Sequence, residues 1–180
     1  YLVPSFVFLE EHHLSSFQSS KSRKQDNVAK IRSFFLDLDC GPSKDFETQE
    51  QALIALRNFC KETGVPRPTM INSGRGVHVY WPLTEEKEPE DWMSVARSFK
   101  NKLSKYKIYA DPAVTSDTAR VLRVPTTHNH KADPPIPVKP IGSLALEPLK
   151  FDMFVEIFGR DTSTTNRPLM KNAVMDKLMG

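Results

Sequence analysis

The chain has 180 residues, of which 39% are hydrophobic and 26% charged, a composition typical of a soluble globular domain. No apolar stretch approaches the roughly 20 residues that a membrane span needs, and the N-terminus lacks the basic and small-residue features of a signal peptide. Two cysteines, Cys40 and Cys60, are too few for a zinc module or a disulfide framework. We therefore expect a cytoplasmic protein with no membrane partner; the net charge of +3 decides nothing about nucleic acid.

The N-terminal part predicts two strands separated by a loop. Residues 4–9 (PSFVFL) have the short apolar run of a strand, and residues 15–30 are polar and free of glycine, which indicates a mobile loop. Residues 31–38 (IRSFFLDL) are apolar almost throughout, which favours a central strand covered on both faces.

A helix is predicted over residues 48–62 (TQEQALIALRNFCKE). Thr48 and Gln51 have the spacing of a capping box, and apolar residues recur behind them at helical spacing. Gly64 and Pro66 mark its C-terminal end, because glycine favours the left-handed cap and proline cannot continue a helix.

Further strands and a second helix follow. Residues 69–73 and 77–83 predict two strands joined by a Gly-Arg-Gly turn, and a helix over about 89–105 begins among acidic residues and ends among lysines, as the helix dipole favours. Residues 106–110 (YKIYA) and 119–125 (ARVLRVP) predict two more strands.

The C-terminal part is less regular. Residues 133–142 are proline-rich and extended, 150–158 predict a short helix, and 169–179 predict a terminal helix after a polar linker. This order of elements predicts an α+β fold with a mainly antiparallel sheet. We expect one domain over residues 1–145, followed by a C-terminal linker and helical segment over 146–180.

Asp37 and Asp39 stand together at the end of the apolar strand. Residues two apart project from the same face of a strand, roughly 6.6 Å apart. Two carboxylates at that separation repel by about 2.5 kcal/mol at an effective dielectric of 20. Mg²⁺ or Mn²⁺, which prefer oxygen ligands, would relieve this repulsion. The alternative is a surface pair of acids beside a turn, with no ligand.

The hairpin INSGRGVHVYW places glycine on both sides of Arg75. Such a turn exposes backbone N–H groups and lets a ligand approach closely, as phosphate-binding turns do. Ser73 ends one predicted strand and His78 begins the next, so both can face a phosphate. A plain glycine-rich hairpin with a half-buried histidine is the alternative.

The stretch YADPAVTSDTARVLRVPTTHNHK carries a further acid and several cations. Asp111 is the candidate that completes a three-carboxylate site; Asp117 competes, although its position better suits a turn. Arg120 and Arg123 lie three apart on a predicted strand and so face opposite sides, which leaves open which of them meets a phosphate. Lys131 follows in a predicted turn.

The chain carries, in this order, LDLDCG, SGRGVH and AD followed by ARVLRVPTTHNHK. These stretches resemble the three motifs of the archaeo-eukaryotic primase superfamily, in the primase–polymerase branch common in phages and mobile elements. The family pattern is hDhD, sxH and a third acidic residue, and the phage-type branch adds an R-x-x-R-x-P-G-T-x-N-x-K-like tail. The resemblance covers residues 31–131. Thr126 stands where the branch usually has glycine, and His128 where an apolar residue is common.

The resemblance implies a catalytic core with an RRM-like sheet packed with helices, and template-directed nucleotidyl transfer by a DNA primase or DNA polymerase. It implies two Mg²⁺ or Mn²⁺ ions held by three catalytic carboxylates, Asp37, Asp39 and Asp111. Candidates for contacting nucleotide phosphates are Ser73, Arg75, His78 (also counted as catalytic), Arg120, Arg123 and Lys131. The implied partners are a single-stranded DNA template, ribo- or deoxynucleoside triphosphates and a replicative helicase, in the host cytoplasm if the chain is phage-encoded.

Two other functions fit parts of the sequence. A non-catalytic, RRM-like replication initiator would bind nucleic acid on such a sheet, but the paired-aromatic signature of RRM proteins does not occur here. A haloacid-dehalogenase-like phosphohydrolase also carries two aspartates after a strand, but needs glycine directly after the second, where this chain has Cys40. Metal-dependent nucleotide incorporation on a single-stranded template separates these possibilities.

Overall fold

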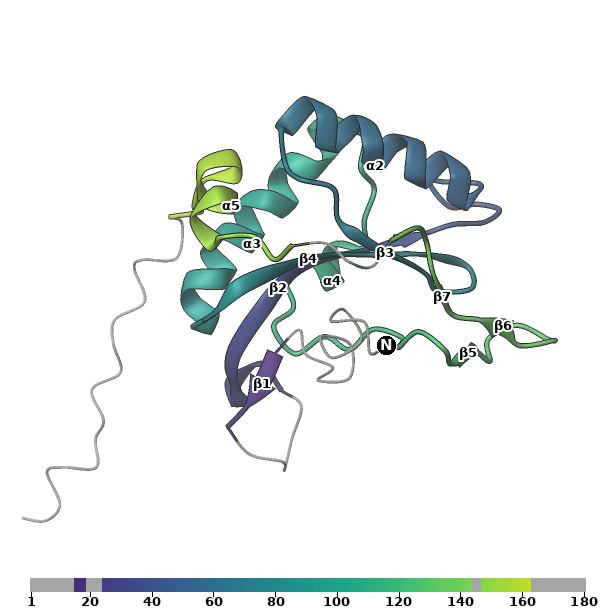
Figure 1. Ribbon diagram of the computed structural model, residues 1–180, viewed down its shortest axis with the longest axis horizontal. Helices are drawn as coiled ribbons and strands as arrows, with labels where there is room; N and C mark the ends of the chain where they lie inside the picture. The colour runs from purple at the N-terminus through teal and green to yellow at the C-terminus, as the bar shows by residue number, and fades with distance from the viewer. Residues whose placement is uncertain (1–14, 19–23, 144–146, 163–180) are drawn as a thin grey trace, which may run out of the picture.

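A five-stranded antiparallel sheet organises the fold (Figure 1). The computed structural model describes residues 15–18, 24–143 and 147–162; the strand predicted at 4–9 and the helix predicted at 169–179 lie outside them. The strands stand in the order β1-β2-β4-β3-β7 and comprise β1 (Ser15–Phe17), β2 (Val28–Asp39), β4 (Gly76–Lys87), β3 (Thr69–Asn72) and β7 (Lys139–Pro140). A separate two-stranded hairpin joins β5 (His128–Asn129) to β6 (Ile136–Pro137).

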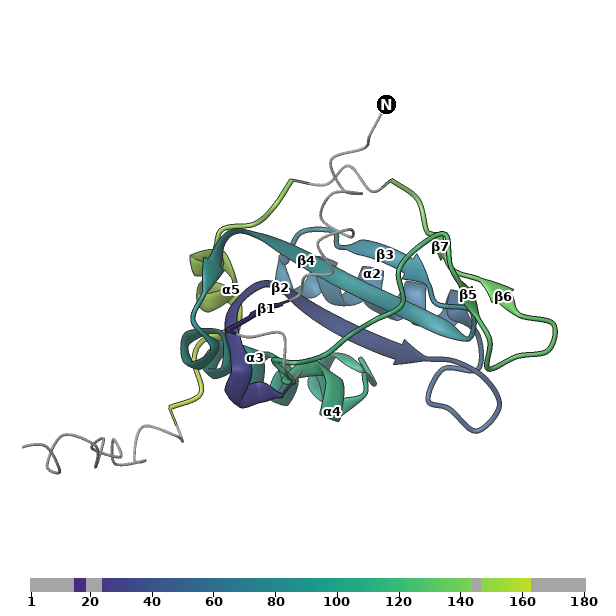
Figure 2. The same ribbon diagram turned by 90° about the horizontal axis from the view of Figure 1, so that it is seen from below.

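Three helices cover one face of this sheet (Figures 1 and 2). They are α2 (Gln49–Thr63), α3 (Pro89–Leu103) and α5 (Phe151–Phe158). Shorter turns are η1 (Gln25–Asn27), η2 (Ser104–Tyr106) and α4 (Pro112–Thr115). The mixed architecture confirms the predicted α+β class with an antiparallel sheet. Within the described part of the chain, no helix is long and apolar enough to cross a membrane.

Aromatic rings fill the core between the sheet and the helices. Phe34 on β2 stacks on Phe154 with ring centroids 4.1 Å apart and on Trp92 at 5.5 Å. Trp81 on β4 meets Phe99 edge to face at 5.7 Å. Helix α5 begins after residue 145, the predicted end of the domain, and its buried phenylalanines belong to this core; the predicted boundary itself stays a prediction.

The first long helix forms where the capping residues predict it. Thr48 Oγ1 accepts a hydrogen bond from Gln51 N at 3.2 Å, which satisfies a free donor of the first turn. The Gln51 side chain reaches back one residue further than in a standard capping box and accepts from Glu47 N at 2.9 Å. Gly64 ends the helix in the left-handed conformation (φ 76°).

The loop predicted over residues 15–30 is only partly a loop. Residues 15–17 form β1, and β2 already starts at Val28. β1 pairs with β2, Ser15 lying opposite Ile31. β1 is the edge strand of the sheet and β2 starts under it, so the polar composition of residues 15–27 concealed where the pairing begins.

The prediction of a strand over residues 106–110 is also wrong. The turn η2 continues α3 to Tyr106, Lys107 adopts a left-handed conformation (φ 57°), and Ile108 N donates to Leu103 O at 3.1 Å. The chain leaves the helix end in this turn, and residues 108–110 form no strand.

The strand predicted over 119–125 does not form either. Asp117 Oδ1 accepts a hydrogen bond from Ala119 N at 3.0 Å, which bends the backbone just before this segment. Residues 116–127 then pass over the sheet face opposite α2, from α4 toward β5, without joining a ladder (Figure 1).

Candidate active site

A cavity of about 1010 Å³ lies where β2 ends, β3 turns into β4 and α2 begins. Residues 120–123 contribute another side of it. All nine residues predicted for the site line this cavity: Asp37, Asp39, Ser73, Arg75, His78, Asp111, Arg120, Arg123 and Lys131. The competing acid Asp117 is not part of the lining. The structure thus gathers the predicted residues, while their individual roles stay predictions.

The three carboxyl groups come together through strand pairing and one backbone hydrogen bond. Asp37 lies opposite His78 and Asp39 opposite Gly76 in the β2–β4 ladder, so both aspartates share the face turned away from buried Leu38. Asp111 N donates to Asp37 O at 3.0 Å, which fixes the start of α4 beside β2. Asp111 therefore begins a helical turn instead of ending a strand.

Asp37 is a largely buried acid with charges of both signs around it. The pKa of Asp37 is raised from 3.8 to about 6, mainly by burial and then by the charges of Asp39 and Asp111, against the opposing effect of Arg120 and Arg123. Only 17% of the Asp37 side chain is exposed. A cation bound to the Asp37 carboxyl would favour its charged form, which burial disfavours.

The acids have other partners in this structure. Asp39 Oδ2 lies 3.0 Å from Lys44 Nζ, and Asp111 Oδ1 accepts from Ala113 N at 2.8 Å as the N-cap of α4. Across the described ranges, no three Asp, Glu, His or Cys side chains stand close enough to hold a metal ion as they are. Their carboxylate oxygens are nevertheless the kind of donor that Mg²⁺ and Mn²⁺ prefer.

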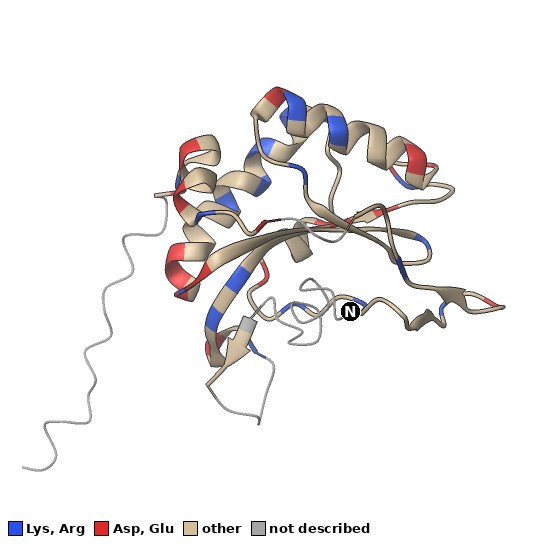
Figure 3. Cartoon of the chain, viewed as in Figure 1, with Lys and Arg blue, Asp and Glu red and all other residues tan. Residues whose placement is uncertain are grey.

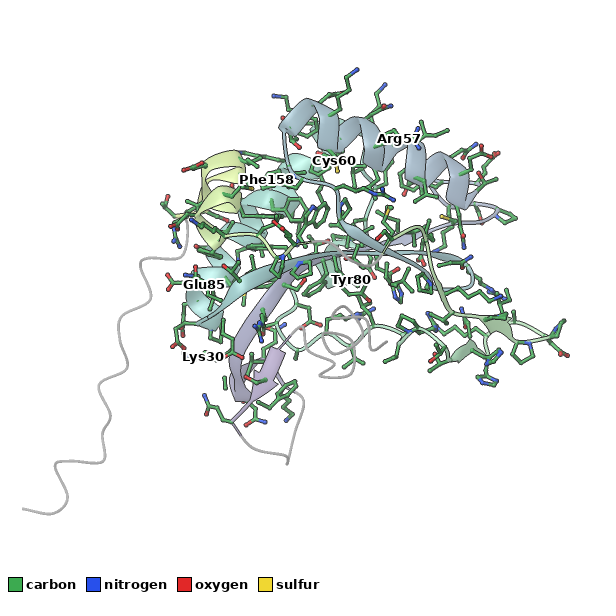
Figure 4. All side chains as sticks on the ribbon, in the orientation of Figure 1. Lys30, Arg57, Cys60, Tyr80, Glu85 and Phe158 are labelled. Carbon is green, nitrogen blue, oxygen red and sulfur yellow. The ribbon has the colours of Figure 1, made fainter. Side chains whose placement is uncertain are left out.

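His78 is buried and neutral. Its Nε2 lies 3.8 Å from Asp37 Oδ1, but burial, with the charges of Arg123 and Arg120, lowers its pKa to about 4. The contact is therefore not an ion pair near neutral pH. Tyr80 Oη lies 3.4 Å from His78 Nδ1, and burial raises the pKa of this phenol above its usual range. Figure 4 shows Tyr80 on the side of the sheet opposite Phe158, which packs with the helices.

The β3–β4 turn is held by side chains from two other segments. Gln49 Nε2, at the start of α2, donates to Asn72 Oδ1 at 3.0 Å and to Gly76 O at 3.2 Å. Asn129 Nδ2 donates to Ser73 O at 2.9 Å. These contacts fix the position of Ser73 and His78 relative to the carboxylates.

The prediction that this turn offers free backbone N–H groups is wrong for Ser73 and Gly74. Ser73 N donates to Gly76 O at 2.9 Å, and Gly74 N donates to Asn72 Oδ1 at 2.8 Å. Gly76 has a different purpose: a Cβ there would lie 2.3 Å from Leu38 O. The glycine therefore allows β4 to approach the end of β2, where the aspartates stand.

Arg120 and Arg123 both face the site, which corrects the prediction that they point to opposite sides. Both act electrostatically on Asp37 and on His78, and both line the cavity. The two-residue alternation does not apply because the segment is not a strand. Arg120 Nε is buried and has no hydrogen-bond partner among the residues that the structure describes.

Two further features complete this side of the cavity. Arg75 Nη2 donates to Lys131 O at 2.8 Å, which ties the β3–β4 turn to the segment after β5. Thr126, in the place where the resembling branch has glycine, adopts a left-handed conformation (φ 71°), so the glycine-like turn is kept. Acidic residues are concentrated at the other end of the molecule, where α3 begins and α5 lies (Figure 3).

Lys44 and Gln49 also line the cavity and were not predicted from the sequence. A single lysine in a polar loop carries no pattern that distinguishes it from a solvated charge. Gln49 follows the predicted N-cap directly, so its place at the start of α2 was implied, but not its contact with a turn 23 residues later in the chain.

Comparisons with known proteins identify the family of the chain. Residues 4–124 match the family model described as LigD, primase-polymerase domain. The fold is similar to the AEP domain of the cyanophage S-2L primase-polymerase, with a TM-score of 0.57 and 13% identity, over 76% of this chain and 65% of that one. No curated protein sequence matches. The chain belongs to the LigD primase-polymerase domain family, in the primase–polymerase branch of the archaeo-eukaryotic primase superfamily.

Proposed function

We propose that this cavity carries out template-directed nucleotidyl transfer, as a DNA primase or DNA polymerase acting in the replication of a phage or mobile element. The family makes nucleotidyl transfer the general expectation. The observation that carries the proposal is the meeting of Asp37, Asp39 and Asp111 with His78 and two arginines in one cavity.

The carboxylates Asp37, Asp39 and Asp111 would hold two divalent ions. Such ions activate the attacking hydroxyl and stabilise the charge of the leaving pyrophosphate. Asp37 would gain from such an ion, because burial disfavours its charged form. Asp39 and Asp111 would exchange their present partners, Lys44 and Ala113 N, for this role.

The cations and His78 would receive the triphosphate. Arg120 Nε is a buried donor without a partner in the described structure, and a phosphate oxygen would satisfy it. His78, neutral near pH 7, contributes a hydrogen bond without adding charge beside Asp37. Ser73, Arg75, Arg123 and Lys131 complete the phosphate-binding set. The partners we propose are a single-stranded DNA template, nucleoside triphosphates and a replicative helicase, in the cytoplasm.

The test is incorporation of labelled nucleotide on four homopolymer templates, with and without a primer, in Mg²⁺, Mn²⁺ or EDTA. We expect incorporation of the complementary nucleotide only when a divalent ion is present, and its loss in Asp37→Ala with the circular dichroism spectrum unchanged. DNA binding that is indifferent to the metal, with no product, would instead favour the non-catalytic initiator.

A further inference from the structure

Lys44 differs from the other basic side chains of the cavity in the residue with which it forms an ion pair. Five Lys and Arg side chains line the cavity: Lys44, Arg75, Arg120, Arg123 and Lys131. Of these, within the residues that the structure describes, Lys44 alone forms an ion pair with a proposed metal ligand, Nζ to Asp39 Oδ2 at 3.0 Å. An ammonium ion thus occupies the carboxylate that a divalent ion would need.

The backbone around Lys44 is held, whereas its side chain is half exposed. Lys44 N donates to Gly41 O at 3.0 Å, and Gly41 N donates to Phe46 O at 2.9 Å, which closes the loop after β2. Phe46 is buried, with its ring 6.0 Å from that of Tyr109. The Lys44 side chain is 51% exposed. Its four-carbon stem can therefore change direction while the loop stays in place.

We propose that Lys44 alternates between two anions, neutralising Asp39 in the metal-free cavity and the triphosphate of the incoming nucleotide once a divalent ion has taken Asp39. This inference rests on the proposed function, because it requires that metal ions and a nucleotide share the cavity. Exposed ion pairs are weak, so a divalent ion bound by several carboxylates displaces an ammonium easily. The displaced ammonium is then repelled by the metal and attracted by the phosphates beside it.

This alternation has opposite consequences for the two ligands. Removing the Lys44 ammonium frees Asp39, so metal affinity in the absence of nucleotide should rise, by about two- to fivefold for an exposed pair. The same change removes a phosphate partner, so triphosphate affinity should fall. A lysine that only stabilises the loop would produce neither effect.

The first experiment measures Mn²⁺ binding without nucleotide, by the electron paramagnetic resonance signal of free Mn²⁺. We expect tighter binding in Lys44→Ala and unchanged binding in Lys30→Ala, whose exposed ion pair with Glu88 lies at the opposite end of β2 from Asp39. In an Asp39→Asn background, Lys44→Ala should have no further effect on Mn²⁺ affinity, because the ion pair is already absent. The four proteins form a double-mutant cycle that isolates the interaction between Lys44 and Asp39. Unchanged Mn²⁺ affinity, or an equal gain in the Asp39→Asn background, would overturn the proposal.

The second experiment compares dATP with dAMP in Mn²⁺, without template, by isothermal titration. Lys44→Ala should weaken dATP binding and leave dAMP binding nearly unchanged, while Lys44→Arg should keep the preference for triphosphate. Equal weakening of both nucleotides would contradict the role of Lys44 at the phosphates. Neither readout uses incorporation, so a chain that binds Mn²⁺ and dATP as expected but makes no product would refute the proposed function and leave this inference standing.

Discussion

Replacing Asp37 by Asn should stabilise the metal-free protein while destroying its metal site. The pKa of Asp37 rises from 3.8 to about 6 on folding. The folded state therefore holds a proton that the unfolded state has lost between these two pH values, so the contribution of this residue to stability falls as the pH rises through that window. The difference corresponds to about 3 kcal/mol above pH 6, and to about half of that at pH 5. Asparagine has the same shape and no charge to bury.

Urea unfolding in EDTA tests this reasoning. We expect Asp37→Asn to raise the free energy of unfolding by about 3 kcal/mol at pH 7.5 and by clearly less at pH 5. Adding Mn²⁺ should stabilise the wild type and not the variant, because only the wild type binds the ion in its folded state. A variant that is less stable than the wild type at pH 7.5, or a difference that does not change with pH, would refute the electrostatic interpretation of the site.

Three further changes have defined outcomes. Phe154→Ala should lower the free energy of unfolding by about 3–5 kcal/mol, whereas Met153→Ala, 37% exposed, should cost little; equal effects would contradict the place of α5 in the core. Gln49→Ala leaves Asn72 Oδ1 with one donor fewer and so loosens the β3–β4 turn. We expect weaker dATP binding in isothermal titration and a loss of about 1–2 kcal/mol in the free energy of unfolding. Unchanged dATP affinity would show that the turn needs no such support. Thr126→Gly should raise the free energy of unfolding by about 1 kcal/mol, and with it the melting temperature, because the left-handed conformation strains a β-branched residue. A lower melting temperature would contradict that strain.

The parts of the site that lie on regular elements could be predicted from the sequence. Asp37 and Asp39 share a face because an apolar strand alternates by two, and the β2–β4 pairing confirms this. The helix after the strand begins at its predicted capping residues. The order of the three motifs indicated which distant residues meet, and the cavity brings them together.

The irregular segments could not be predicted in the same way. YKIYA and ARVLRVP alternate like strands, but a strand needs a neighbour with free backbone groups, which no local pattern reveals. Without that ladder, the facing of Arg120 and Arg123 is set by the path of the loop over the sheet. The pairing of Lys44 with Asp39 depends equally on loop geometry, namely the turn closed by Gly41 and Phe46.

The most direct test of the site is the comparison of two acids six residues apart, one inside the cavity and one outside. Asp111 lines the cavity and caps α4, whereas Asp117 caps the next turn and is not part of the lining. Asparagine caps both turns about as well as aspartate, so neither change should unfold the chain. In metal-dependent, template-directed incorporation, Asp111→Asn should lose activity by about 100-fold or more, and Asp117→Asn should stay near the wild type. Activity retained in Asp111→Asn, or lost in Asp117→Asn alone, would contradict the assignment of the cavity as the catalytic centre.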